Sequence, residues 1–140
     1  MTLVRHCLWF SLLMSVMSVM PASAEVVRVD GEALESLRTS GVPVIDVRRP
    51  DEWRRTGVIE GSHRLTFFDA NGRYDLEQWL AQLRKIAGPG ERFVLICRSG
   101  GRSGAVSRLL DEQLGYTQVH DAAGGILKWL EAGRPVVSVE

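Results

Sequence analysis

The fold of this chain is decided by the stretch Phe93-Val94-Leu95-Ile96-Cys97-Arg98-Ser99-Gly100-Gly101-Arg102-Ser103-Gly104. Its first four residues are all apolar, which is typical of a strand that is buried on both faces in a parallel sheet. The strand cannot continue after Cys97, because the two glycines that follow favour positive φ. Ser103 is a good N-cap for a helix that reaches Leu114. The stretch therefore predicts a strand, a tight loop and a helix, with Cys97 at the turn.

Strands and helices alternate on both sides of this stretch. We expect strands at 26–29, 43–48 and 117–120, and a turn with a short strand within 58–65. We expect helices within 30–41, 50–57, 76–86 and 124–133, with Asp30 and Asp75 as caps and Pro50 at a first helical position. This alternation predicts an α/β fold with a mostly parallel central sheet and helices on both faces. Ligands bind beyond the carboxyl ends of such strands, where Cys97 and residues 46–48 should lie.

The first 24 residues have the pattern of a secretory signal peptide. Arg5 precedes a run of apolar and small residues at 7–20, and residues 22–24 form an Ala-x-Ala site that predicts cleavage after Ala24. The apolar run is shorter than the roughly 20 residues that a membrane-spanning helix needs, although a retained anchor is the alternative. We therefore expect a periplasmic or secreted protein with a signal peptide at 1–24 and one domain at 25–140. No membrane attachment is expected after cleavage.

Charge and cysteine content further restrict the possible functions of the protein. The chain has 17 basic and 17 acidic residues, which predicts no general attraction to nucleic acid or to a membrane surface. Cys97 is the only cysteine after the signal peptide, so it has no internal disulfide partner. A lone thiol in an oxidising compartment is at risk of oxidation, which favours a chemical role over an inert buried cysteine. His63 and His120 give no metal-ligand spacing, and we expect neither a metal nor a cofactor.

The loop after Cys97 is suited to stabilise a thiolate. Helix N-termini and neighbouring cations lower the pKa of a cysteine, and here loop amides and two arginines, Arg98 and Arg102, surround the sulfur. Cys97 could then ionise at neutral pH without a general base. Arginine also binds an oxyanion at two points, which favours an anionic substrate.

These residues resemble those of the rhodanese-like sulfurtransferases. The family's active-site loop has a cysteine, four further residues, an arginine and then a helix, as at 97–103. Residues 44–48 with Glu52 and Trp53 are similar to its Asp-Val-Arg signature. Residues 124–126 with Trp129 are similar to its C-terminal Gly-Gly-Ile and Trp signature. All three occur in order and at family spacing, and the chain most resembles the small exported single-domain members.

The resemblance implies a rhodanese-like domain and a ping-pong reaction. Cys97 would attack the outer sulfur of thiosulfate or a similar donor, and cyanide or a thiol would then remove that sulfur from a persulfide. The donor, a small sulfur-containing anion, would be bound by the loop residues Arg98, Ser99, Gly100, Gly101, Arg102 and Ser103. The acceptor could also be a protein, and no cofactor is implied.

Three alternative functions could also use a cysteine in such a loop. Phosphatase and arsenate chemistry uses a wider loop with five residues between cysteine and arginine, whereas four separate Cys97 from Arg102. A persulfide carrier that serves a protein partner with little small-molecule turnover remains an alternative. A thiol redox protein is disfavoured because there is no resolving cysteine.

The remaining polar and aromatic residues are expected to have mainly structural roles. Asp46 and Arg48 could tune the loop from outside, but the expected role is an ion pair between Arg48 and Glu52 that fixes the corner. His63 and His120 are expected to be plain strand-end histidines, because sulfur transfer from a thiolate needs no base. Core positions are expected for the tryptophans Trp53, Trp79 and Trp129.

Overall fold

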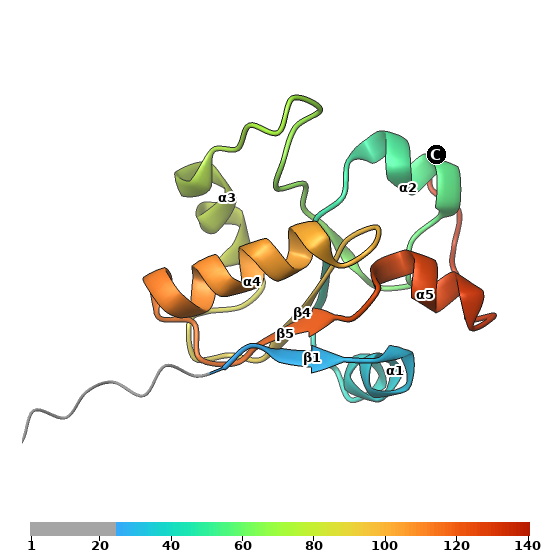
Figure 1. Cartoon of the computed structure of the whole chain (residues 1–140), viewed down its shortest axis with the longest axis horizontal. Helices are drawn as coiled ribbons and strands as arrows, with labels where there is room; N and C mark the ends of the chain where they lie inside the picture. Colours follow the sequence, from blue (N-terminus) through green and yellow to red (C-terminus); the bar gives the residue numbers. More distant parts are fainter. Residues whose placement is uncertain (1–24) are drawn as a thin grey trace, which may run out of the picture.

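Five strands and five helices alternate along residues 25–140, the part of the chain that a computed structural model describes (Figure 1). The strands are β1 (Val27–Val29), β2 (Val44–Asp46), β3 (His63–Arg64), β4 (Phe93–Ile96) and β5 (Val119–Ala122). The helices are α1 (Gly31–Thr39), α2 (Pro50–Thr56), α3 (Leu76–Leu83), α4 (Gly101–Leu114) and α5 (Gly125–Glu131). The predicted signal peptide lies outside the described residues. Within them, no helix is both long and apolar enough to cross a membrane.

The strands form one sheet in the order β1-β5-β4-β2-β3, and every pair of neighbouring strands is parallel. β4 is therefore central, as its continuous apolar run predicted. The register places Ile96 beside Asp46 and Leu95 beside Asp121. The carboxyl ends of β2, β4 and β5 consequently meet at one edge of the sheet. Cys97 follows β4 at this edge, which is where ligands were predicted to bind.

The sheet is covered on both faces, which confirms the predicted architecture (Figure 1). Alternate residues of β4 point to opposite sides, because side chains along a strand have a period of two. Phe93, Leu95 and Cys97 pack with α3 and α4, whereas Val94 and Ile96 pack with α1 and α5. The three tryptophans expected in the core are buried there. Cys97 thus points from the central strand towards α4.

The residues predicted at the N-terminal ends of α1, α2 and α3 are confirmed, and the one predicted for α4 is not. The carboxylates of Asp30 and Asp75 accept hydrogen bonds from backbone N–H groups in the first turns of α1 and α3, and Pro50 begins α2. The N-cap prediction for Ser103 is wrong. α4 begins two residues earlier, at Gly101, and its N-cap is Gly100 with φ of 98°. Glycine adopts this left-handed conformation without steric cost, so the chain turns into the helix before it reaches Ser103.

Two element boundaries also differ from the expectations. The last strand was expected at 117–120, but β5 runs from Val119 to Ala122, because the backbone N–H of Thr117 is bonded to the carbonyl of Pro89 outside the sheet. The helix expected to reach residue 86 ends at Leu83, after which the chain tightens into turns. The shift of β5 places Asp121 inside the sheet.

Candidate active site

The sulfur of Cys97 lies at the turn between β4 and α4, where two donors reach it. The side chain is buried, with 1% of its surface exposed. The backbone N–H of Gly100 donates to Sγ at 3.1 Å, and the hydroxyl of Ser103 donates to it at 3.3 Å. The N-terminal end of α4 follows directly and carries the positive end of the helix dipole. Two hydrogen-bond donors and the positive end of a helix dipole therefore converge on this sulfur.

The start of the loop is held from the opposite side by α5. The N–H of Ile126 donates to the carbonyl of Cys97 at 2.9 Å, and the N–H of Leu127 donates to that of Arg98 at 3.1 Å. Gly125 has φ of 60°, and a Cβ built on it would lie 2.5 Å from both of those carbonyl oxygens. Only glycine permits this approach, which explains why the Gly-Gly-Ile signature sits beside the loop.

Asp46 and Arg48 form a buried ion pair with each other. Nε and Nη2 of Arg48 donate to the Asp46 carboxylate at 2.9 and 2.7 Å, and its other bonds go to the Thr56 hydroxyl and the Gly57 carbonyl. The predicted pair between Arg48 and Glu52 is therefore wrong. The side chains of Asp46 and Arg48, two residues apart, point to the same side. The Asp46 carboxylate therefore binds the guanidinium of Arg48 in place of Glu52. The pair fixes the corner after β2, where the N–H of Val47 is bonded to the carbonyl of Ile96 directly before Cys97.

Glu52 pairs instead with Arg102 of the loop. Two bonds of 2.8 and 2.6 Å join the guanidinium to the carboxylate in a bidentate arrangement. The hydrogen bond from Arg102 holds the pKa of Glu52 at about 2, well below its ordinary value of 4.5, and the same bond raises the pKa of Arg102. Arg102 is thus charged and held in one orientation by α2. The pairing of Glu52 with Arg102 was not predicted from the sequence, although Glu52 and Trp53 belong to the family signature.

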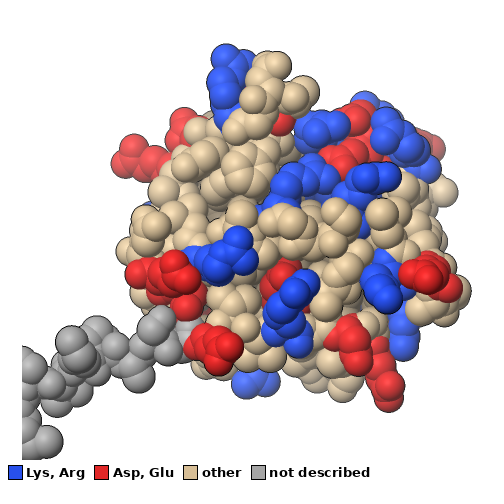
Figure 2. Space-filling view, viewed as in Figure 1, with Lys and Arg blue, Asp and Glu red and all other residues tan. Residues whose placement is uncertain are grey.

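The other loop residues lie where a substrate could meet them. Arg98, Ser99 and Gly101 are exposed, and Gly100 is half-buried. In the view of Figure 2, basic side chains gather over the region of α2 and the N-terminal end of α4, with acidic ones among them. Salt bridges of Arg49 and Arg55 to Asp51 account for part of this mixture. Of the two loop arginines, Arg98 is therefore the exposed one, and Arg102, paired with Glu52, is the half-buried one.

The histidines are not part of this arrangement. His63 is exposed on β3, and the register of His120 with Val94 turns it to the face opposite Cys97. Nδ1 of His120 lies 3.2 Å from the carbonyl oxygen of Gln118. Within residues 25–140, no cluster of three or more His, Cys, Asp or Glu side chains could hold a metal ion.

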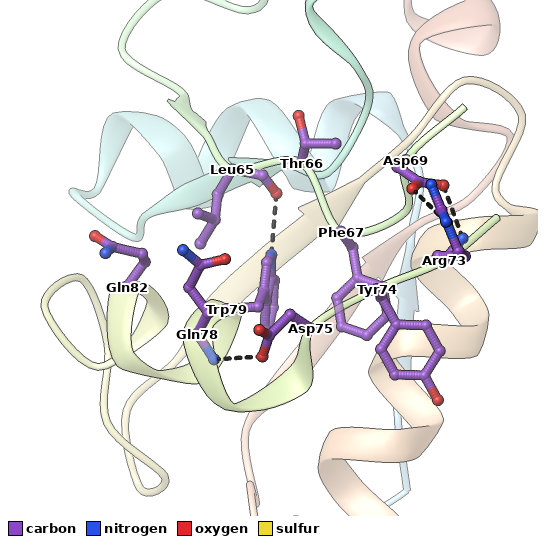
Figure 3. A pocket seen from close by; sticks show the side chains of 10 residues that line it. All are labelled: Leu65, Thr66, Phe67, Asp69, Arg73, Tyr74, Asp75, Gln78, Trp79 and Gln82. Atoms are coloured by element: carbon purple, nitrogen blue, oxygen red, sulfur yellow. Dashed lines mark hydrogen bonds and ion pairs between the residues drawn. The ribbon is translucent and has the colours of Figure 1, made fainter. Parts of the chain in front are cut away.

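Hollows of similar size open at several places on the described surface, and two of them are of interest here because of their position or their lining. The first, of about 540 Å³, lies between residues 65–75 and α3, where Figure 3 shows the rings of Phe67, Tyr74 and Trp79 close together and the Asp69 and Arg73 pair at one side. The second, of about 460 Å³, is bordered by Gly100, Gly101 and Gly104. Its lining also includes Asp121, a buried acid that was not predicted because the last strand was expected two residues too early.

This fold and site define a class of α/β proteins that carry a cysteine on a turn between the central parallel strand and a helix. Residues 30–132 match the family model of the rhodanese-like domain, and the chain belongs to that family. It is 30% identical over 122 residues to Thiosulfate sulfurtransferase 18 of Arabidopsis thaliana, with 83% of this chain and 87% of the relative covered. It is 32% identical over 115 residues to a sulfurtransferase of Allochromatium vinosum, with 80% and 95% covered.

A solved structure supports the same assignment of fold. A rhodanese-related protein from Thermoplasma volcanium superposes with a TM-score of 0.60 at 30% identity, with 79% of this chain and 97% of that chain covered. The chain therefore spans nearly the whole length of that protein. The rhodanese-like fold predicted from the three signatures is confirmed.

Proposed function

We propose that this protein is a thiosulfate-type sulfurtransferase that carries the transferred sulfur as a persulfide on Cys97. The observation that carries the proposal is the pair of donors, the Gly100 N–H and the Ser103 hydroxyl, that converge on Sγ at the start of α4. They stabilise negative charge on sulfur, which both the attacking thiolate and the persulfide bear. The similarity to a thiosulfate sulfurtransferase of comparable length supports the choice of donor.

The reaction balances without a cofactor or an oxidant. The Cys97 thiolate attacks the outer sulfur of thiosulfate, a new S–S bond forms, and the S–S bond of thiosulfate breaks as sulfite leaves with the electron pair. Cyanide or a thiolate then attacks the outer sulfur of the persulfide and regenerates the Cys97 thiolate. The leaving group in both steps is already an anion of low basicity, so neither step requires a proton from His63 or His120.

The loop arginines have separate roles in this scheme. Arg98 is exposed and attracts the anionic donor to the loop. Arg102 uses two of its five N–H bonds on Glu52, and its remaining N–H groups orient the donor oxygens. Ser99, Gly100 and Gly101 contribute backbone N–H groups, as the family resemblance implies. Asp46 and Arg48 act as structural support beneath the corner.

A persulfide carrier for a protein acceptor is the second candidate function. The 1% exposure of Cys97 favours it, because a buried persulfide is shielded from small thiols until a partner approaches. We also propose that the protein is exported and cleaved after Ala24. N-terminal sequencing of the exported protein tests that part, and a start at any residue other than Glu25 contradicts it.

The intact mass of the protein tests the chemistry. Thiosulfate should add one sulfur, about 32 Da, and cyanide should remove it. The Cys97→Ser variant should fold with the same melting curve and gain no mass. Steady turnover of thiosulfate and cyanide supports the enzyme, whereas loading without turnover supports the carrier. No gain of mass by protein with a free Cys97 thiol would refute both.

A further inference from the structure

The hollow beside α3 has an aromatic lining that no step of the proposed reaction uses. The rings of Phe67 and Trp79 lie 4.9 Å apart, centre to centre, and both residues are buried. Tyr74 stacks on Phe67 at 4.9 Å, and 53% of its surface is exposed (Figure 3). Nε1 of Trp79 donates to the carbonyl of Leu65 at 3.1 Å, which fixes the orientation of that ring. A group of fixed aromatic rings is therefore open to an occupant.

This hollow lies at the same edge of the sheet as Cys97. The N–H of Phe67 donates to the carbonyl of Val47, and the N–H of Val47 donates to the carbonyl of Ile96. Neighbouring strands are about 4.8 Å apart, so two such steps place the backbone of Phe67 about 10 Å from the residue that precedes Cys97. Phe67 and Cys97 also pack on the same face of the sheet. An occupant of the hollow is thus within reach of the loop.

The charged groups at the border of the hollow already have partners. The carboxylate of Asp69 accepts bonds from the backbone N–H and Nε of Arg73 at 2.9 and 3.1 Å. The carboxylate of Asp75 accepts a bond from the backbone N–H of Gln78 at the start of α3. The volume of about 540 Å³ falls within the roughly 300–1,000 Å³ that is usual for ligand pockets. The hollow therefore suits an uncharged apolar group better than an ion.

We propose that this hollow binds an aromatic side chain of a protein acceptor whose thiol receives the sulfur. Tyrosine, tryptophan and arginine, which all line the hollow, are enriched where proteins bind each other most strongly. Cys97 is 1% exposed, so an acceptor thiol has to be held at the loop to reach its persulfide. A side chain three residues from the thiol in an extended segment spans the distance of about 10 Å. The inference rests on the proposed function, because it names the acceptor class for the same reaction.

The transfer itself needs no further reactant. The acceptor thiolate attacks the outer sulfur of the persulfide, and a new S–S bond forms on the acceptor. The S–S bond to Cys97 breaks, and its electron pair returns to the Cys97 sulfur. The acceptor leaves as a persulfide. The bound side chain contributes only by holding the acceptor thiol at the loop.

Two peptides, Cys-Gly-Gly-Phe and Cys-Gly-Gly-Ala, test the proposal as acceptors for the full protein. Turnover starts from thiosulfate and is followed by the release of sulfite. The reacting thiol is the same in both peptides, so the ratio of their kcat/KM values reports the binding of the ring. We expect the phenylalanine peptide to be at least tenfold better, because burial of one phenyl ring corresponds to a gain of roughly tenfold to hundredfold. Equal values for the two peptides overturn the proposal.

Three variants locate the effect. Tyr74→Ala removes the exposed ring of the hollow, and Gln78→Glu adds a carboxylate at its border, in a helix position where an acid is favourable. Each should reduce the preference for the phenylalanine peptide at least threefold, and Gln78→Glu decides alone if Tyr74→Ala does not fold. Val27→Ala changes an exposed apolar residue on β1, at the opposite edge of the sheet, and should keep the preference. A preference that Gln78→Glu leaves unchanged, or one shown only by free phenylalkyl thiols, overturns the proposal.

Failure of the proposed function gives a separate result. No release of sulfite from thiosulfate with cyanide as acceptor would refute the chemistry. Docking is then measured without sulfur, as the binding of Ser-Gly-Gly-Phe and Ser-Gly-Gly-Ala by ligand-observed NMR. Stronger binding of the phenylalanine peptide, weakened by Gln78→Glu, supports the hollow as a docking site, and equal binding of the two peptides refutes it.

Discussion

Removal of the carboxylate of Glu52 should destabilise the fold without removing the helix cap of α2. Glu52→Gln loses the bidentate bond to Arg102, yet it keeps an amide oxygen that can accept from the N–H of Arg49, 3.0 Å from Oε2. Exposed ion pairs contribute up to about 1 kcal/mol, and breaking a fully buried pair costs roughly 3–5 kcal/mol. The side chain of Glu52 is 6% exposed and that of Arg102 is 26% exposed, which places the pair between these limits. We expect a loss of about 2 kcal/mol, after solvent screening at Arg102, and a fall in Tm of roughly 10 °C.

The stability lost in Glu52→Gln should be greatest at neutral pH and should decrease in acid. The folded-state pKa of Glu52 is about 2 and its ordinary value is 4.5, so its contribution is fully present above about pH 4.5. The contribution is lost as the pH falls from there towards 2, because the carboxylate of the native protein becomes protonated. Thermal unfolding of wild type and Glu52→Gln should therefore differ most at pH 7 and converge in acid.

A matched control lies one residue away. Asp51 of α2 pairs with Arg49 at 3.1 Å but is exposed, so Asp51→Asn should leave the melting midpoint nearly unchanged. Equal midpoints for Glu52→Gln and wild type at pH 7 would refute the reasoning. So would a difference that stays constant between pH 7 and 3, since the titration of Glu52 could not then be its source.

Two further substitutions test the supports of the loop. Asp46→Asn should cost about 3 kcal/mol in urea unfolding, because it leaves the buried guanidinium of Arg48 without its counter-charge; an unchanged urea midpoint would show that the pair is not stabilising. Gly125→Ala should slow alkylation of Cys97 at least tenfold, because its Cβ must push away the carbonyls of the loop. Gly61→Ala is its control: φ is similarly positive at 77°, nothing lies within 4 Å of the new Cβ, and alkylation should stay at the wild-type rate.

The place of Cys97, at the turn after the central strand, could be predicted because local and global signals agree there. Four apolar residues, followed after three positions by two glycines, favour a short buried strand and a sharp turn, and the alternation of elements places that strand inside a parallel sheet. The family signatures give the same result, since Gly125 marks the point where α5 approaches the loop. Where a backbone conformation requires glycine, the glycine itself can be found in the sequence.

The partner of Arg102 could not be predicted in the same way. Asp46, Asp51 and Glu52 are all close to the corner in sequence, and the choice among them depends on how α2 is rotated against the sheet. Arg48 takes Asp46 because both side chains are buried and two residues apart, which leaves Glu52 to face the loop. Asp121 was missed for a different reason. Strand ends are set by hydrogen bonds to neighbouring strands, and a shift of two residues moved it from a turn into the sheet.

The loop is fixed mainly through its backbone, and this has a chemical consequence. The carbonyls of Cys97 and Arg98 are bound by N–H groups of α5, and the carbonyl of Ile96 is bound by Val47. In the loop held in this way, the N–H of Gly100 points at the sulfur. Donors that are oriented before the reaction cost no reorganisation when charge develops on sulfur. In the proposed reaction, the fold itself thus supplies an oriented N–H donor to the sulfur of Cys97, while the exposed Arg98 is available to the anionic sulfur donor.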